Sequence, residues 1–332
     1  MKTDIHQHVW TWQLVAALSE RDQLPFVRSE NGLTVLHLAG ERPYVIDMHG
    51  EAPARRAAQA RQDGLDLALI CLSSPLGIEA LARSQAEPLL DAYHEGALSL
   101  GEPFGVWGAI ALDGARPQDV DAVLERGCVG LSLPAGALAS VDAVAQMHDV
   151  LERLEHHGAP LLVHPGPAAP ETSLTDPLWW PAMTRYVACQ QAAWLAFRAA
   201  GRPRHPRLRI AFSMLAGLAP LQHERLLARG GPAAGSPDPL LFYETSSYGP
   251  RAASMMADLV GASCLLYGSD RPVVDPAGHS AAGWHDWEIA ADAAARLLGR
   301  RAPGGADPDR HSPRAPQRRP GAVPGARTLV SR

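Results

Sequence analysis

Lysine is almost missing from this chain of 332 residues, since Lys2 is the only one and every other basic residue is an arginine. A P-loop nucleotide site needs a lysine at a glycine-rich turn, and a pyridoxal-phosphate enzyme needs one inside its pocket. A single lysine at position 2 suits neither requirement. The sequence therefore excludes both classes of protein.

Excess charge, paired cysteines and long apolar runs are also lacking. The 30 basic residues against 35 acidic ones leave a net charge of −5, which argues against binding nucleic acid through bulk charge. No run reaches the roughly 18 apolar residues of a membrane span, and residues 1–6 lack the apolar core of a secretory signal. Without a CxxC pair, the cysteines are predicted to be buried, reduced thiols of a cytoplasmic protein. They are Cys71, Cys128, Cys189 and Cys264.

Eight short apolar runs alternate with longer segments of helical pattern. The runs cover residues 3–9, 65–72, 104–112, 128–133, 160–164, 208–214, 240–245 and 263–270, and helices are expected at 54–62, 117–126, 141–157 and 284–298. Most runs are continuously apolar, as strands buried on both faces of a parallel sheet are. Eight such units favour an α/β fold of the (β/α)8 TIM-barrel type, and no GxGxxG follows the first run as a Rossmann fold requires.

Two segments do not fit the eight units. Residues 11–53 exceed a normal connection and contain β-like runs at 33–38 and 43–46, with turn signals at Asn31-Gly32 and Ala39-Gly40. They predict a small antiparallel insertion near the barrel mouth. Residues 302–332 are rich in proline and arginine and are expected to be disordered. We therefore expect one barrel domain over residues 1–301, with the insertion at 11–53.

Three histidines and one aspartate lie where barrel strands are predicted to end. His6 and His8 stand two apart on the first strand and so share a face, while His164 ends the fifth strand and Asp270 the eighth. Active sites of TIM barrels lie at the carboxyl ends of the strands. Three imidazoles and a carboxylate suit one divalent ion such as Zn²⁺, with a coordination position left open for water.

These motifs resemble the amidohydrolase superfamily. The likeness is closer to its amidohydrolase-related branch, which includes aminocarboxymuconate-semialdehyde decarboxylase. It is carried by Asp4-Ile5-His6-Gln7-His8, by Leu162-Val163-His164, by Tyr267-Gly268-Ser269-Asp270-Arg271-Pro272 and by residues 206–225, and it spans about residues 1–299. The resemblance implies a distorted (β/α)8 barrel and one divalent metal ion, with zinc as the expected ion. Its ligands would be His6, His8, His164 and Asp270, and Asp270 would also accept a proton from the bound water.

The sequence departs from that family at the end of the sixth strand, where a histidine is usual and Met214 stands here. A thioether cannot carry protons at neutral pH and is a poor ligand for a hard ion. Either another group, such as His223 nine residues later, replaces the histidine, or Asp270 alone moves the proton. Related binuclear enzymes bridge two metals with a carbamylated lysine on the fourth strand. Residues 129–134 contain no lysine, so a single ion is expected.

Substrate-facing residues are predicted next to the ligands. Arg271 suits a substrate carboxylate because its guanidinium binds bidentately, although a salt bridge at the barrel rim explains it equally well. Trp10 could wall the pocket or could simply pack in the core. Three more tryptophans could likewise line the pocket or pack in the core. Three histidines outside the predicted ligand set could assist in acid–base chemistry. These are Trp12, Trp179 and Trp180, and His49, His279 and His285.

The leading functional hypothesis is a metal-dependent hydrolase of a small organic substrate. A metal-bound water would attack an amide, lactone or related acyl bond, with Asp270 and His164 as catalytic residues. The second hypothesis is a non-oxidative decarboxylase of an aromatic or unsaturated carboxylic acid, which Met214 disfavours and Arg271 favours. A non-catalytic ligand-binding barrel and a structural histidine cluster without metal are the third and fourth hypotheses. The family likeness also suggests a homodimer formed through the insertion.

Overall fold

Eight parallel strands form one sheet in the order β1-β5-β6-β7-β8-β9-β10-β11. The computed structural model describes residues 1–167, 176–231, 237–274 and 287–300. The strands are β1 Thr3–Gln7, β5 Leu67–Ile70, β6 Phe104–Gly108, β7 Gly130–Pro134, β8 Leu161–His164, β9 Ile210–Phe212, β10 Leu241–Glu244 and β11 Leu265–Leu266. Each lies inside one of the eight predicted runs or within one residue of it, which confirms the predicted strand order.

Backbone hydrogen bonds between β1 and the segment after β11 close the sheet into a barrel. Ile5 N–H donates to the Tyr267 carbonyl at 3.0 Å, and Asp270 N–H donates to the His6 carbonyl at 2.9 Å. Only two residues of the eighth predicted run pair as a regular strand; residues 263–264 end a 3-10 helix, and residues 267–270 form this looser seam. The (β/α)8 fold is thus confirmed, and its distortion lies beside the residues that carry the predicted ligands.

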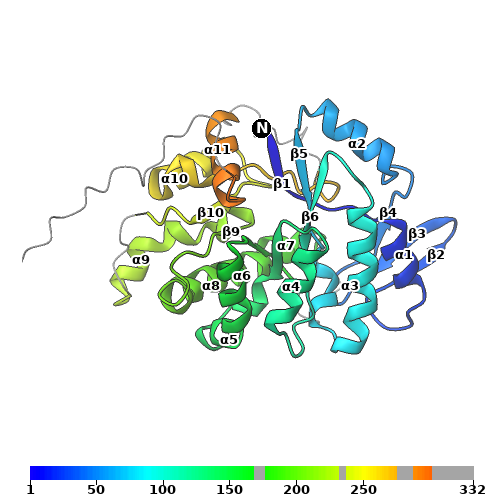
Figure 1. Cartoon of the computed structure of the whole chain (residues 1–332), viewed down its shortest axis with the longest axis horizontal. Coiled ribbons are helices and arrows are strands. Elements are labelled where there is room, and N and C mark those ends of the chain that lie inside the picture. Colours follow the sequence, from blue (N-terminus) through cyan, green and yellow to red (C-terminus); the bar gives the residue numbers. More distant parts are fainter. Residues whose placement is uncertain (168–175, 232–236, 275–286, 301–332) are drawn as a thin grey trace, which may run out of the picture.

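Helices cover the outside of the barrel, as Figure 1 shows. The helix predicted at 141–157 is two helices that meet at Met147. Among the described residues, no helix has the length and apolar character needed to cross a membrane. The helices are α2 Pro53–Gln62, α3 Arg83–Leu98, α4 Pro117–Glu125, α5 Val141–Gln146, α6 His148–His157, α7 Trp180–Met183, α8 Arg185–Ala196, α9 His223–Ala228, α10 Pro250–Val260 and α11 Trp287–Leu297.

The lower interior of the barrel is filled with apolar side chains. Trp107 is fully buried there, and its indole Nε1–H donates to the Ile5 carbonyl at 2.9 Å. This layer is a solid floor, so chemistry has room only above it, at the carboxyl ends of the strands. Its members include Ile5, Leu69, Cys71, Trp107, Leu162, Phe242 and Leu266.

The insertion between β1 and β5 lies to one side of the barrel (Figure 1). It contains α1 Trp12–Ser19 and an antiparallel sheet of β2 Phe26–Glu30, β3 Leu33–His37 and β4 Tyr44–Ile46. The sheet confirms the prediction, but its first strand was missed because FVRSE shows little apolar pattern. A buried Arg56 ties the insertion to β1, since it donates to Glu51 Oε1 and to Gln7 Oε1, each at 2.9 Å.

Several sequence predictions fall outside the described residues. They concern His279 and His285, the start of the last predicted helix at residue 284, and the tail at 302–332.

Candidate metal centre

The structure brings the four predicted ligands together at the barrel mouth. The Nε2 atoms of His6 and His8 lie 3.2 Å apart, and that of His164 lies 3.1 Å from His6 and 3.3 Å from His8. Asp270 Oδ1 lies 3.1 Å from His8 Nε2 and 3.6 Å from His6 Nε2. All three imidazoles are buried, whereas the Asp270 side chain keeps 19% of its surface exposed. The carboxylate is therefore the member of the group that solvent reaches.

Each imidazole turns its other nitrogen, Nδ1, toward an oxygen that can only accept a hydrogen bond. Nδ1 must therefore carry the proton in the neutral ring, and the Nε2 lone pair is left facing the other two rings. Such outer partners orient the ligands of metal sites. The pairs are His6 with Glu244 Oε2 at 3.1 Å, His8 with the Cys71 carbonyl at 2.9 Å, and His164 with the Pro165 carbonyl at 2.8 Å.

In the neutral rings three lone pairs converge, and this arrangement fits a cation. In a tetrahedral zinc site with Zn–N bonds of about 2.0–2.1 Å, the ligand nitrogens stand about 3.3 Å apart. The observed separations of 3.1–3.3 Å match that spacing. The ligand atoms of His6, His8, Cys71 and His164 all lie within 4.8 Å of one another, which identifies a group that could hold a metal ion.

Burial and neighbouring charges give the three histidines different pKa values. Burial would lower the pKa of His6, but its electrostatic interactions and hydrogen bonds with Cys71 and Glu244 outweigh burial and raise this pKa well above its usual value. For His8, burial is likewise outweighed, by Cys71 and by the hydrogen bond to Asp270, and the pKa rises to about 9. Burial, together with the charges of His6 and His8, lowers the pKa of His164 well below its usual value. Protons and a cation therefore compete for the same nitrogens.

Glu244 is fully buried at the end of β10 and was not predicted from the sequence. Its Oε2 accepts hydrogen bonds from His6 Nδ1, from Met214 N–H at 3.2 Å and from Ser246 Oγ at 2.9 Å, while Oε1 accepts from Ser246 N–H. A β-carbon at Gly268 would collide with this carboxylate. The available signal was an acidic residue next to the end of the apolar run LLFYET.

Met214 occupies the position predicted for it, directly after β9 and Ser213. It starts a left-handed turn in which residues 214–218 all have φ between 52° and 62°. Its backbone N–H holds Glu244, so the position contributes to the site through the main chain. His223, considered as a replacement for the usual histidine, begins α9 and lines a different cavity.

The predicted substrate residues have partners within the protein. Arg271 Nε lies 3.3 Å from Asp63 Oδ2, which is the salt bridge that the sequence left open. Trp10 is 5% exposed, and its ring centroid lies 5.9 Å from that of Tyr44 on β4. A substrate role for either residue stays a prediction. The remaining candidates among the described residues are exposed, and they are Trp12, Trp179, Trp180 and His49.

A cavity of about 320 Å³ opens between the insertion, the segment before α7 and the residues that follow Asp270. Tyr44, Leu178 and Val273 line it with apolar surface, while Glu41 and Arg42 add charge. Val273 lies three residues after Asp270, so the cavity adjoins the chain that carries the candidate ligand. This is a size that holds a small organic molecule.

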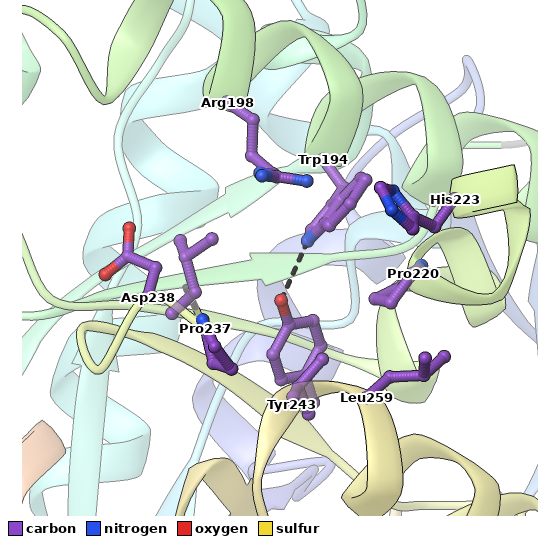
Figure 2. A pocket seen from close by; sticks show the side chains of 10 residues that line it. Trp194, Arg198, Pro220, His223, Pro237, Asp238, Tyr243 and Leu259 are labelled. Atoms are coloured by element: carbon purple, nitrogen blue, oxygen red, sulfur yellow. Dashed lines mark hydrogen bonds between the residues drawn. The ribbon is translucent and has the colours of Figure 1, made fainter. Parts of the chain in front are cut away.

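A second cavity lies on the outer side of the barrel, where Tyr243 and Trp194 of α8 join in a hydrogen bond of 3.0 Å (Figure 2). Tyr243 alternates along β10 with Phe242 of the barrel interior and with Glu244 at the histidine cluster. Alternate residues of a strand point to opposite faces, so this second cavity is separated from the cluster by the strand itself.

Similar folds are found among solved structures of decarboxylases. The Metarhizium anisopliae IDCase in apo form aligns with a TM-score of 0.72 at 16% identity, covering 90% of this chain and 97% of that one. The 5-carboxyvanillate decarboxylase of Sphingomonas paucimobilis gives 0.70 at 17% identity, with 90% and 99% covered. A Novosphingobium aromaticivorans 5-carboxyvanillate decarboxylase complexed with manganese gives 0.61 at 16% identity, with 74% and 79% covered.

No family model matches the sequence, and no curated protein matches it either. At identities of 16–17%, the structural comparisons establish the fold, which is the barrel that these decarboxylases have. The resemblance that the sequence motifs indicate is thus confirmed at the level of fold. The manganese complex shows that a protein with this fold can bind a divalent ion.

Proposed function

We propose that this protein is a metal-dependent, non-oxidative decarboxylase of an aromatic carboxylic acid. The observation that carries the proposal is the set of three imidazole Nε2 atoms, 3.1–3.3 Å apart, with a partly exposed carboxylate beside them at the barrel mouth. Two decarboxylases share the fold over 90% of this chain, with TM-scores of 0.72 and 0.70. Hydrolysis has only the wider superfamily in its favour.

One set of residues holds the metal ion, and another residue transfers the proton. When bound, a divalent ion supplies positive charge that orients the substrate's oxygens and stabilises negative charge. His6, His8 and His164 hold that ion, and Glu244 keeps His6 in the tautomer that presents Nε2. The barrel floor below them excludes water from that side.

Asp270 supplies the proton that decarboxylation requires. When the bond between the ring carbon and the carboxylate breaks, the electron pair stays on the ring carbon and CO₂ leaves. A proton from Asp270 then replaces the lost carboxyl group on that carbon. Because the Asp270 side chain is 19% exposed, it can recover a proton from solvent for the next cycle. The arylcarboxylate and one proton thus become the arene and CO₂, and no oxidant is needed.

The cavity that Val273 lines, three residues along the chain from Asp270, is suited to an aromatic ring. Its volume of about 320 Å³ and its lining by Tyr44, Leu178 and Val273 offer apolar surface to a flat substrate. Arg42 and Glu41 place charges of opposite sign at its wall.

The test measures loss of acid and release of CO₂ from a panel of hydroxybenzoic acids, with the protein loaded with Zn²⁺ or Mn²⁺. A parallel panel of amides, lactones and esters measures hydrolysis. We expect CO₂ from at least one acid, and Asp270→Asn should lower kcat by a factor of about 100 or more. The exposed Asp142 of α5 provides the matched control, Asp142→Asn, which should keep wild-type kcat.

Hydrolysis of an ester or amide without any decarboxylation would overturn the proposal in favour of the hydrolase. Binding of an acid without turnover in the metal-loaded protein would favour the ligand-binding barrel. Full activity of Asp270→Asn would remove Asp270 from the proton transfer.

A further inference from the structure

Cys71 stands at the metal centre although no sequence motif marks it. The residue directly follows β5, the strand that pairs with β1. Its N–H donates to the Gln7 carbonyl at 2.8 Å, and its carbonyl accepts from His8 Nδ1 at 2.9 Å. Two hydrogen bonds to its backbone therefore fix Cys71 against the segment that bears His6 and His8.

The Cys71 thiol points among the histidines. Sγ lies 3.6 Å from His8 Nδ1, the nitrogen that faces the Cys71 carbonyl, and it lies within 4.8 Å of one ring nitrogen each of His6, His8 and His164. The side chain is 1% exposed and also contacts the apolar floor of the barrel. Cys71 thus approaches the cluster from the closed interior, whereas Asp270 approaches it from the solvent side.

Packing alone does not require a thiol at this position. The neighbours of Cys71 in the barrel floor are leucine, isoleucine, alanine and aromatic side chains, and a small aliphatic residue would fill the same volume. Within the described residues, the other three cysteines belong to no group that could hold a metal. The thiol therefore stands at the one place in the described structure where three imidazole lone pairs converge.

We propose that Cys71 is a sulfur ligand of the metal ion held by His6, His8 and His164. Metal–thiolate bonds of about 2.3 Å exceed metal–imidazole bonds of about 2.0–2.1 Å, so a sulfur ligand stands farther from the nitrogens than they stand from one another. Binding breaks the S–H bond, and the proton leaves to solvent as the sulfur–metal bond forms. The inference rests on the proposed function only in requiring a metal at this site.

A sulfur donor changes both the metal preference and the role of Asp270. Thiolate is a soft ligand that favours Zn²⁺ and Co²⁺ over the hard ion Mn²⁺. With three nitrogens and one sulfur around the ion, the Asp270 carboxylate is free of coordination and available for proton transfer. The site would then differ in metal preference from a related fold that binds manganese.

The experiment loads the full-length protein with one equivalent of Co²⁺ and records its near-ultraviolet spectrum. A thiolate–cobalt charge-transfer band is expected in the wild type and should be lost in Cys71→Ser. The matched control is Cys189→Ser on α8, a partly buried cysteine outside the cluster, which should keep the band. Cys71→Ser should also lower Zn²⁺ affinity by about tenfold or more, since losing even an outer partner of a ligand costs about 10–100-fold.

Two further measurements distinguish failure of the Cys71 proposal from failure of the proposed function. X-ray absorption of the zinc-loaded wild type should contain a sulfur scatterer at about 2.3 Å, and it needs no variant that must fold. One bound equivalent of metal with nitrogen and oxygen ligands alone would overturn the role of Cys71 and leave the proposed function standing. Failure to bind Co²⁺, Zn²⁺ or Mn²⁺ at all would overturn both.

Discussion

Replacing Glu244 by glutamine tests how the buried carboxylate supports the metal centre. In the native protein both oxygens accept hydrogen bonds, with Ser246 N–H on Oε1 and three donors, including His6 Nδ1–H, on Oε2. Glutamine has one acceptor oxygen and one amide group that only donates. Whichever way the amide turns, a donor faces a donor.

The lower-cost orientation keeps the amide oxygen at the Oε2 position and leaves Ser246 N–H unpaired. An unsatisfied buried donor costs about 1–3 kcal/mol, which corresponds to a decrease in Tm of roughly 2–4 °C for each kcal/mol. His6 Nδ1–H then faces a neutral acceptor instead of a carboxylate, so Nε2 becomes a weaker ligand. We expect Glu244→Gln to bind Zn²⁺ about 10–100-fold more weakly.

The assay is competition for Zn²⁺ against a chromophoric chelator, together with a thermal denaturation curve of the metal-free protein. Glu224→Gln on the exposed surface of α9 is the matched control and should change neither quantity. A lower Tm with unchanged Zn²⁺ affinity would refute the support of His6 by Glu244 and leave the carboxylate a structural role only.

Three further changes test the surroundings of the site. The pKa of buried His94, whose Nε2 accepts from Ala109 N–H, is lowered by burial from 6.5 to about 4. As the pH falls, His94 is therefore protonated first in the unfolded chain. The free energy of unfolding, measured by urea denaturation, should decrease by up to about 3 kcal/mol between pH 6.5 and pH 4, and this decrease should be absent from His94→Gln. Arg56→Met leaves the buried Glu51 carboxylate without this positive partner and should lower the free energy of unfolding by about 3–5 kcal/mol. Gly268→Ala places a β-carbon against Glu244 and should lower both Zn²⁺ affinity and Tm, at a cost of about 1–3 kcal/mol.

Each of these three substitutions has a control variant or a result that would contradict its explanation. A steep acid transition that persists in His94→Gln would assign it to other groups. Glu51→Gln combined with Arg56→Met should recover part of the stability, because no buried charge is then left alone. Gly249→Ala, where a β-carbon meets open space, should be close to neutral, and an equal loss there would contradict the steric account of Gly268.

Local sequence pattern was sufficient for the elements that bury one continuous apolar surface. The eight runs and the candidate ligands His6, His8, His164 and Asp270 could be located because each candidate lies at or near the carboxyl end of its own strand or run. Elements without such a pattern were missed. β2 carries the polar sequence FVRSE and is held by pairing with β3, and the break at Met147 interrupts a helical pattern that looks continuous.

The sequence by itself determined the barrel class, the single-lysine exclusions and the spacing of the two histidines on β1, because these depend on composition and on the two-residue period of a strand. Only the tertiary structure decided which other side chains meet them. Glu244 and Cys71 come from β10 and from the end of β5, and neither has a motif that distinguishes it from an ordinary strand residue. Cys71 meets His8 because β5 pairs with β1. Glu244 meets His6 because the sheet closes at β1, and closure depends on the packing of all eight strands at once.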